Sequence, residues 1–135
     1  MDEELFEAAR DVRLRAHAPY SNFLVGAALR TAAGTVHAGA NVENAAYPEG
    51  WCAEPSAIAH MIAASVEKGA RRIVALTCVA DPIGGRPTTP CGGCRQRIAE
   101  FSGPDTLVHC LSPEGAGRTY TMAELLPGAF SMDKA

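Results

Sequence analysis

Two short cysteine motifs constrain this chain more than any other feature. The first is Cys52-Ala53-Glu54, and the second is Pro90-Cys91-Gly92-Gly93-Cys94. Each stands at the start of a segment whose apolar spacing predicts a helix. A fold that brings the two helix starts together would place three thiol groups and one carboxylate in a single site.

Three thiolates with one open position describe a catalytic zinc site, whereas a closed structural site usually needs a fourth protein ligand. The other two cysteines, Cys78 and Cys110, lie inside apolar runs, so we interpret them as small core residues. Water in the open position would become acidic enough to supply hydroxide near neutral pH. Glu54, two residues after a ligand, would then move protons.

A Cys-x-x-Cys motif alone would also be compatible with a redox pair or a structural metal site. The complete pattern matches the signature of zinc deaminases, in which the glutamate is an acid/base group rather than a ligand.

The remaining sequence predicts alternating helices and strands. Helices are expected at residues 3–16, 52–68, 91–102 and 123–126, and strands at 23–30, 35–40, 71–80, 106–111 and 118–121. Residues 41–50 and 81–90 are expected as loops, and Gly69 as a helix C-cap. This order predicts a five-stranded mixed sheet in a three-layer α/β/α arrangement. A length of 135 residues predicts one domain, residues 1–135.

The composition and charge of the chain limit the classes of molecule that it can bind. The net charge is -3 and no basic block occurs, which argues against a nucleic acid held through its phosphates. The apolar runs are too short to cross a bilayer and the acidic N-terminus is unlike a signal peptide, so we expect a cytoplasmic location without a membrane partner. An odd number of cysteines, five, argues against a disulfide framework.

From Pro19 to Phe130 the chain resembles the small, homotetrameric cytidine deaminases with a three-cysteine zinc site. Besides the two cysteine motifs, the resemblance rests on Tyr20–Leu29, on Asn41–Tyr47 and on Leu125–Phe130. It implies a cytidine deaminase-like fold, a homotetramer with shared active sites, and one zinc per subunit. The implied reaction is deamination of cytidine or deoxycytidine to uridine or deoxyuridine in pyrimidine salvage.

The resemblance also implies roles for individual residues. Cys52, Cys91 and Cys94 would bind zinc, and Glu54 would be catalytic. Phe23 would pack on the pyrimidine ring, and Asn41 and Glu43 would hydrogen-bond the ribose. Phe130 would cover the base from a neighbouring subunit. The full set implied to bind substrate is Phe23, Asn41, Glu43, Ala45, Tyr47, Ala53 and Phe130.

Three positions depart from the family pattern. Pro55 stands where the small members usually carry an arginine that offsets the thiolate charge, Leu24 replaces a proline, and bulky Trp51 precedes the first ligand. Helix N-termini, Arg95 and Arg97 are the alternatives for offsetting that charge. The departures leave open a modified pyrimidine nucleoside or nucleoside antibiotic as substrate. A non-catalytic, zinc-stabilised binding module is the alternative from another class, and it would not need Glu54.

Overall fold

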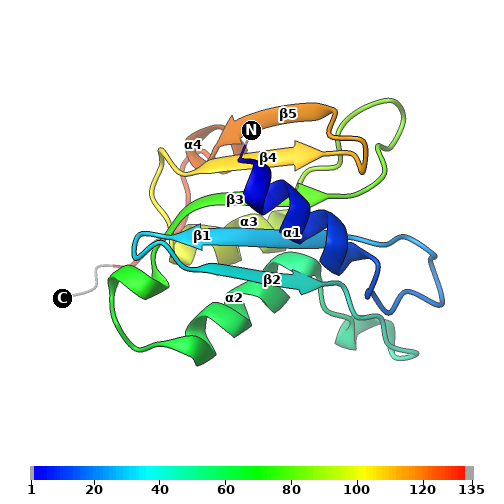
Figure 1. Ribbon diagram of the computed structural model, residues 1–135, viewed down its shortest axis with the longest axis horizontal. Coiled ribbons are helices and arrows are strands. Elements are labelled where there is room, and N and C mark those ends of the chain that lie inside the picture. The colour runs from blue at the N-terminus through cyan, green and yellow to red at the C-terminus, as the bar shows by residue number, and fades with distance from the viewer. Residues whose placement is uncertain (1, 133–135) are drawn as a thin grey trace.

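The computed structural model describes residues 2–132, and within them a five-stranded sheet forms the centre of the molecule (Figure 1). The strand order is β2-β1-β3-β4-β5. Strands β3 and β4 are parallel, whereas the other neighbouring pairs are antiparallel. The prediction of a five-stranded mixed sheet is therefore confirmed. The strands are β1 (Gly26–Thr31), β2 (Val36–Ala40), β3 (Ile73–Val79), β4 (Leu107–Leu111) and β5 (Gly117–Thr121).

Helices cover both faces of this sheet, as predicted. Helix α1 (Glu3–Arg13) lies on one face, and α2 (Ala53–Ala64) and α3 (Gly92–Glu100) lie on the other (Figure 1). A buried apolar cluster under α1 contains Leu5, Phe6, Ala9, Ala28, Val79 and Leu111. A larger cluster under α2 and α3 includes Leu29, Ala57, Met61, Leu76, Ile98 and Val108. Two cores on opposite faces of one sheet give the three-layer α/β/α fold.

Two glycines allow the helices to approach the sheet closely. A Cβ atom at Gly26 would lie 2.0 Å from the carbonyl oxygen of Ala9 in α1, and one at Gly39 would lie 2.5 Å from the amide nitrogen of Ala57 in α2. Neither distance is sterically possible, so a side chain at either glycine would push a helix away from the sheet. The contact at Gly39 sets the depth of α2, whose N-terminal end carries Cys52.

Several predicted boundaries were too generous. The first strand begins at Gly26 rather than Phe23, so half-buried Phe23 precedes the strand. Helix α2 ends with Ser65 as its C-cap, and Gly69 begins a 3-10 turn instead of capping the helix. Residues 47–49, predicted as loop, also form a 3-10 turn. Val66, Glu67 and Lys68 are exposed, so α2 ends where its residues no longer pack against the sheet.

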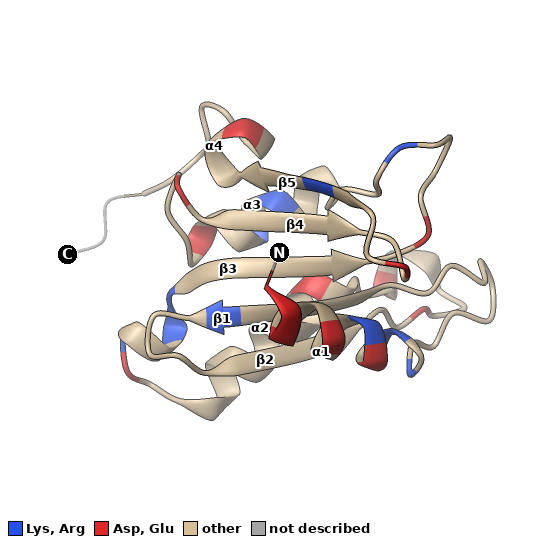
Figure 2. Ribbon diagram, turned by 45° about the horizontal axis from the view of Figure 1, so that its top comes forward, with Lys and Arg blue, Asp and Glu red and all other residues tan. Residues whose placement is uncertain are grey.

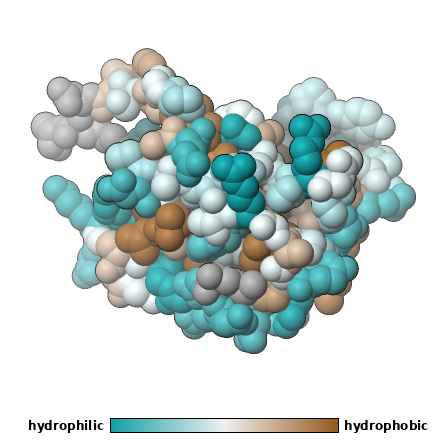
Figure 3. All heavy atoms as spheres, turned by 90° about the horizontal axis from the view of Figure 1, so that it is seen from above, coloured by the Kyte–Doolittle hydropathy of each residue, from teal (hydrophilic) through white to brown (hydrophobic). Residues whose placement is uncertain are grey.

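The surface mixes charge and hydrophobicity in small groups. Acidic residues occupy the first turn of α1, and basic residues are scattered along the chain (Figure 2). Apolar side chains on the face in Figure 3 form separate patches among hydrophilic ones. Among the described residues, no helix is both long enough and apolar enough to span a membrane.

Candidate metal centre and active site

The starts of α2 and α3 bring three cysteines together. Cys52 is the N-cap of α2, Cys91 is the N-cap of α3, and Cys94 lies in the first turn of α3. Their sulfur atoms all lie within 4.8 Å of one another. Cys94 is buried, whereas Cys52 and Cys91 are exposed. The two motifs, distant in sequence, thus form one cluster because α2 and α3 pack side by side on the same face of the sheet.

The donor set and its dimensions fit zinc. Zn–S bonds of about 2.3 Å in tetrahedral geometry separate sulfur atoms by roughly 3.8 Å, within the span of this cluster. The thiols of Cys94 and Cys91 hydrogen-bond the Cys52 sulfur, and these contacts, with the charge of Arg97, outweigh burial and lower the pKa of Cys52 to about 6. The contact with Cys52 and burial raise the pKa of Cys94. One proton is therefore easily lost from the cluster, which prepares it for a cation.

Glu54 lies beside the cysteines in the first turn of α2, and only 5% of its surface is exposed. Burial is the main reason that the pKa of Glu54 rises to about 7, and the nearby Cys52 thiolate adds to the rise. A carboxyl group with a pKa near neutral can both accept and donate a proton under ordinary conditions. This is the behaviour expected of a general acid/base group.

The other two cysteines belong to the core, as expected from the sequence. Cys78 in β3 and Cys110 in β4 are direct neighbours in the parallel register, and both are buried. Burial raises the pKa of both thiols, that of Cys110 to about 12. They are therefore neutral apolar residues, unlike the cluster at the helix starts.

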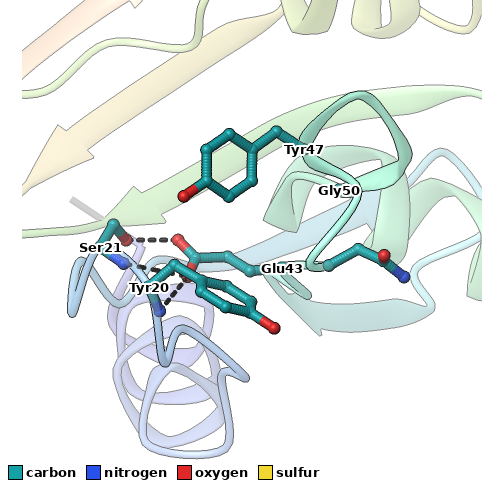
Figure 4. Close-up of a pocket in the computed structure, with 6 residues that line it drawn as sticks. Tyr20, Ser21, Glu43, Tyr47 and Gly50 are labelled. Atoms are coloured by element: carbon teal, nitrogen blue, oxygen red, sulfur yellow. Dashed lines mark hydrogen bonds between the residues drawn. The ribbon is translucent and has the colours of Figure 1, made fainter.

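A pocket of about 340 Å³ opens between the segments that precede β1 and follow β2 (Figure 4). Glu43 lies in this pocket and accepts hydrogen bonds from the amide nitrogens of Tyr20 (2.9 Å) and Ser21 (3.1 Å) and from the Ser21 hydroxyl. The Ser21 hydroxyl contributes most to lowering the pKa of Glu43, so this carboxylate is ionised. The pocket is lined by Tyr20, Ser21, Glu43, Asn44, Tyr47 and Gly50.

Two of the predicted substrate residues, Glu43 and Tyr47, thus line one pocket. Asn41 follows β2 directly and binds the segment that precedes β1. Its Oδ1 accepts a hydrogen bond from the amide nitrogen of Val25 (2.9 Å), and its Nδ2 donates one to the carbonyl oxygen of Phe23 (2.9 Å). Each polar atom of this amide retains capacity for a second hydrogen bond. Asn41 therefore holds the segment containing Phe23 in place and can still contact a ligand.

Three further predicted residues lie apart from this pocket. Phe130 is 71% exposed and lines a different groove, of about 330 Å³, together with residues of α3 and of the short helix α4 (Met122–Leu125). Its carbonyl oxygen accepts from the side chain of Gln96 at 3.1 Å, which ties the C-terminal segment to α3. Ala45 is exposed in the loop after β2, and Ala53 is buried between the ligand Cys52 and Glu54.

The sequence prediction missed Tyr20 and Ser21 as site residues. The Tyr20 and Tyr47 rings meet edge to face with centroids 6.0 Å apart, and Ser21 binds Glu43. Asn22, which follows them, has a left-handed backbone conformation with φ of 58°. Their position in a turn was visible in the sequence, but their contact with residues 43–47 depends on the path of both loops.

Comparison with known proteins gives one consistent result. A profile described as "Cytidine and deoxycytidylate deaminase zinc-binding region" matches residues 1–110. A cytidine deaminase of Sporosarcina psychrophila is 43% identical over 97% of this chain and 92% of that protein. A cytidine deaminase of Halalkalibacterium halodurans is 42% identical over 98% of this chain and 97% of that protein. The crystal structure of cytidine deaminase from Burkholderia pseudomallei superimposes with a TM-score of 0.85 at 40% identity and covers 96% of this chain and 99% of that one.

Proposed function

Because this chain belongs to the cytidine deaminase family of zinc-dependent hydrolytic enzymes, we propose that it deaminates cytidine or deoxycytidine through the Cys52, Cys91, Cys94 and Glu54 cluster. The observation that carries the proposal is the convergence of three cysteine sulfurs beside a buried carboxyl group. One zinc per subunit suits this donor set. A metal site that only stabilised the fold would have no need of Glu54.

The residues of the chain divide the work of the reaction. Cys52, Cys91 and Cys94 would hold the zinc, which would make a bound water molecule acidic enough to act as the nucleophile near neutral pH. Glu54 passes on the two protons of the attacking water in turn. It takes the first as the C4–O bond forms and delivers it to the ring nitrogen N3, and then takes the second from the oxygen on C4 and delivers it to the amino group, which leaves as ammonia when the C4–N bond breaks. Burial of Glu54 keeps its carboxyl group neutral or charged in comparable amounts near neutral pH, as such a two-way transfer requires. The products are the uracil nucleoside and ammonia.

We assign the sugar to the pocket at Glu43. An ionised carboxylate held by the Tyr20 and Ser21 amides suits a neutral donor such as a ribose hydroxyl. Asn41, Glu43, Ala45 and Tyr47 are proposed as substrate contacts on the sugar side. Phe23 and Ala53 are proposed on the base side, with Phe130 supplied by a neighbouring subunit. The same proposal includes a single domain formed by residues 1–135 and the assembly of four such subunits. It also includes a role for the enzyme in cytoplasmic pyrimidine salvage.

The proposal is tested by measuring zinc per subunit and following the ultraviolet absorbance of added cytidine. We expect about one zinc per chain and loss of the cytidine absorbance. Replacing Glu54→Gln should lower kcat by at least about 100-fold while zinc remains bound, because the amide keeps the shape but transfers no proton. Glu49→Gln is the matched control, since Glu49 is an exposed carboxylate in the nearby 3-10 turn. Near-normal activity of Glu54→Gln would show that another group transfers the proton.

A further inference from the structure

Arg97 of α3 lies against the cysteine cluster. It follows Cys94 by one helical turn, and its Nη1 donates to the Cys94 sulfur at 3.8 Å. The same nitrogen lies 3.5 Å from where a Cβ atom of Gly93 would be. The guanidinium therefore reaches back over the first turn of α3. The sulfur of buried Cys94 thus has a permanent cation as a hydrogen-bond donor.

Trp51 holds the guanidinium in this position. Its ring lies under Arg97, with the guanidinium carbon 5.0 Å from the ring centroid. The backbone of Trp51 is itself fixed, because it exchanges two hydrogen bonds of 2.8 Å with Val42. A cation over an indole face is attracted by the ring, so the stack lowers the freedom of a long side chain. Trp51 precedes one ligand and Arg97 follows another, and their contact joins the two halves of the site.

The other arginine of α3, Arg95, donates its hydrogen bonds to groups outside the cysteine cluster. Arg95 donates from Nε to the Pro90 carbonyl oxygen (2.7 Å), from Nη1 to the Leu125 carbonyl oxygen (2.8 Å) and from Nη2 to Thr89 (3.0 Å). Its role is to hold the loop before Cys91. In α2 the first turn contains Glu54 and Pro55 but no basic residue. Among residues 2–132, Arg97 is thus the arginine with a hydrogen bond to a cysteine of the cluster.

We propose that Arg97, oriented by Trp51, is a positioning residue that offsets the thiolate charge and thereby strengthens zinc binding. This inference rests on the zinc site of the proposed function. Three thiolates around a divalent cation leave a net charge of about -1 on the site. A hydrogen bond from the permanently charged guanidinium partly neutralises this negative charge. Groups that hydrogen-bond metal ligands typically change metal affinity by about 10- to 100-fold.

The test measures the zinc dissociation constant of the holoenzyme by competition with a chromophoric chelator. Arg97→Gln should raise this constant about 10- to 100-fold, because the amide retains a polar side chain without the charge. Arg97→Lys should recover most of the affinity because the charge remains. Arg10→Gln is the matched control: Arg10 also stacks on an aromatic ring, Phe6 at 5.2 Å, but on the opposite face of the sheet. It should leave the constant unchanged.

Equal zinc affinity of Arg97→Gln and the unchanged protein would overturn the inference, and so would a Lys variant as weak as the Gln variant. If Arg97→Gln does not fold, Trp51→Leu and Trp51→Phe replace it. The Leu variant should bind zinc more weakly than the Phe variant, whose ring can still stack, and equal affinities would refute the role of the stack. Absence of zinc from the unchanged protein would instead overturn the proposed function, so the two failures are distinct.

Discussion

The five cysteines of this protein have two different chemical characters, although all are the same residue. Cys78 and Cys110 are surrounded by the core, and burial keeps their thiols protonated. Cys52, Cys91 and Cys94 lie at helix starts, and the contacts of Cys94 and Cys91 with Cys52, together with the charge of Arg97, lower the pKa of Cys52 to about 6. The same side-chain type thus packs inside the sheet and forms the cluster at the starts of α2 and α3.

A substitution at Glu43 tests the proposal that this pocket binds the sugar of the substrate. Glu43→Gln should lower kcat/KM for cytidine by about 10- to 100-fold, since a hydrogen bond to a charged acceptor contributes about 1.5–3 kcal/mol. Free cytosine, which lacks the sugar, should be a poor substrate for the unchanged enzyme and should be affected little by the substitution. Initial rates on both substrates provide the measurement. Comparable turnover of cytosine and cytidine would contradict a ribose role for Asn41 and Glu43.

At the scale of elements, the site depends on where helices begin. Helices α2 and α3 bring their starts together on one face of the sheet, and each start has unpaired amide groups next to the cluster. Helix α1 begins on the other face, where Asp2 caps it by accepting from the Leu5 amide at 3.2 Å. Asp2 also pairs with Arg30 of β1 at 3.0 Å, which fastens the helix to the sheet.

The Asp2 cap makes stability depend on pH in a known direction. Burial raises the pKa of Asp2, but the hydrogen bonds from Leu5 and Arg30 outweigh it and hold the pKa below its usual value. A lowered folded-state pKa stabilises the protein above the unfolded value, near 3.9, and this contribution is lost as pH falls through the folded value.

We therefore expect Asp2→Ala to destabilise the protein by about 1 kcal/mol at pH 7, a decrease of a few degrees in Tm. The difference from the unchanged protein should shrink once Asp2 is protonated at low pH. Asp2→Asn should destabilise the protein less than Asp2→Ala because asparagine also caps helices.

Asp11→Ala, at an exposed position of α1, is the control. A Tm difference that stays constant down to pH 3 would exclude the charge of Asp2 as its source. Thermal unfolding monitored by circular dichroism measures each case.

At the scale of the whole molecule, one subunit brings together the metal ligands and Glu54 but leaves Phe130 exposed at the other groove. An exposed aromatic residue near the end of the chain suits a contact with a second subunit. The proposed assembly would therefore complete the substrate site by adding an aromatic cover that a single chain does not place there.

Mixed assemblies can test this directly. Phe130→Ala should lower kcat/KM by about two- to tenfold, since an aromatic contact contributes about 0.5–1.5 kcal/mol. Co-expression of Phe130→Ala subunits with inactive Glu54→Gln subunits should restore part of the activity, because intact Glu54 then meets Phe130 from a neighbour. Light scattering gives the assembly size. Activity that never exceeds the weighted mean of the two variants would place Phe130 and Glu54 in the same subunit.

The sequence by itself determined the element order, the mixed sheet and the two motifs whose cysteines and glutamate meet in one cluster. These follow from local patterns: apolar spacing distinguishes helix from strand, and a thiol or carboxylate at a helix start has its chemistry wherever the helix lies. The two predicted core cysteines were identified in the same way, because an apolar strand buries what it contains.

Only the tertiary structure decided which distant side chains meet. Local patterns could not choose between Arg95 and Arg97, since both lie on α3; the choice depends on the loop at Thr89, the end of α4 and the pairing of Trp51 with Val42. The contact of Ser21 with Glu43 likewise depends on two loops meeting above the sheet. Such contacts are set by packing and chain path rather than by local backbone preference, which is why side chains that carry charge across the site became visible only in three dimensions.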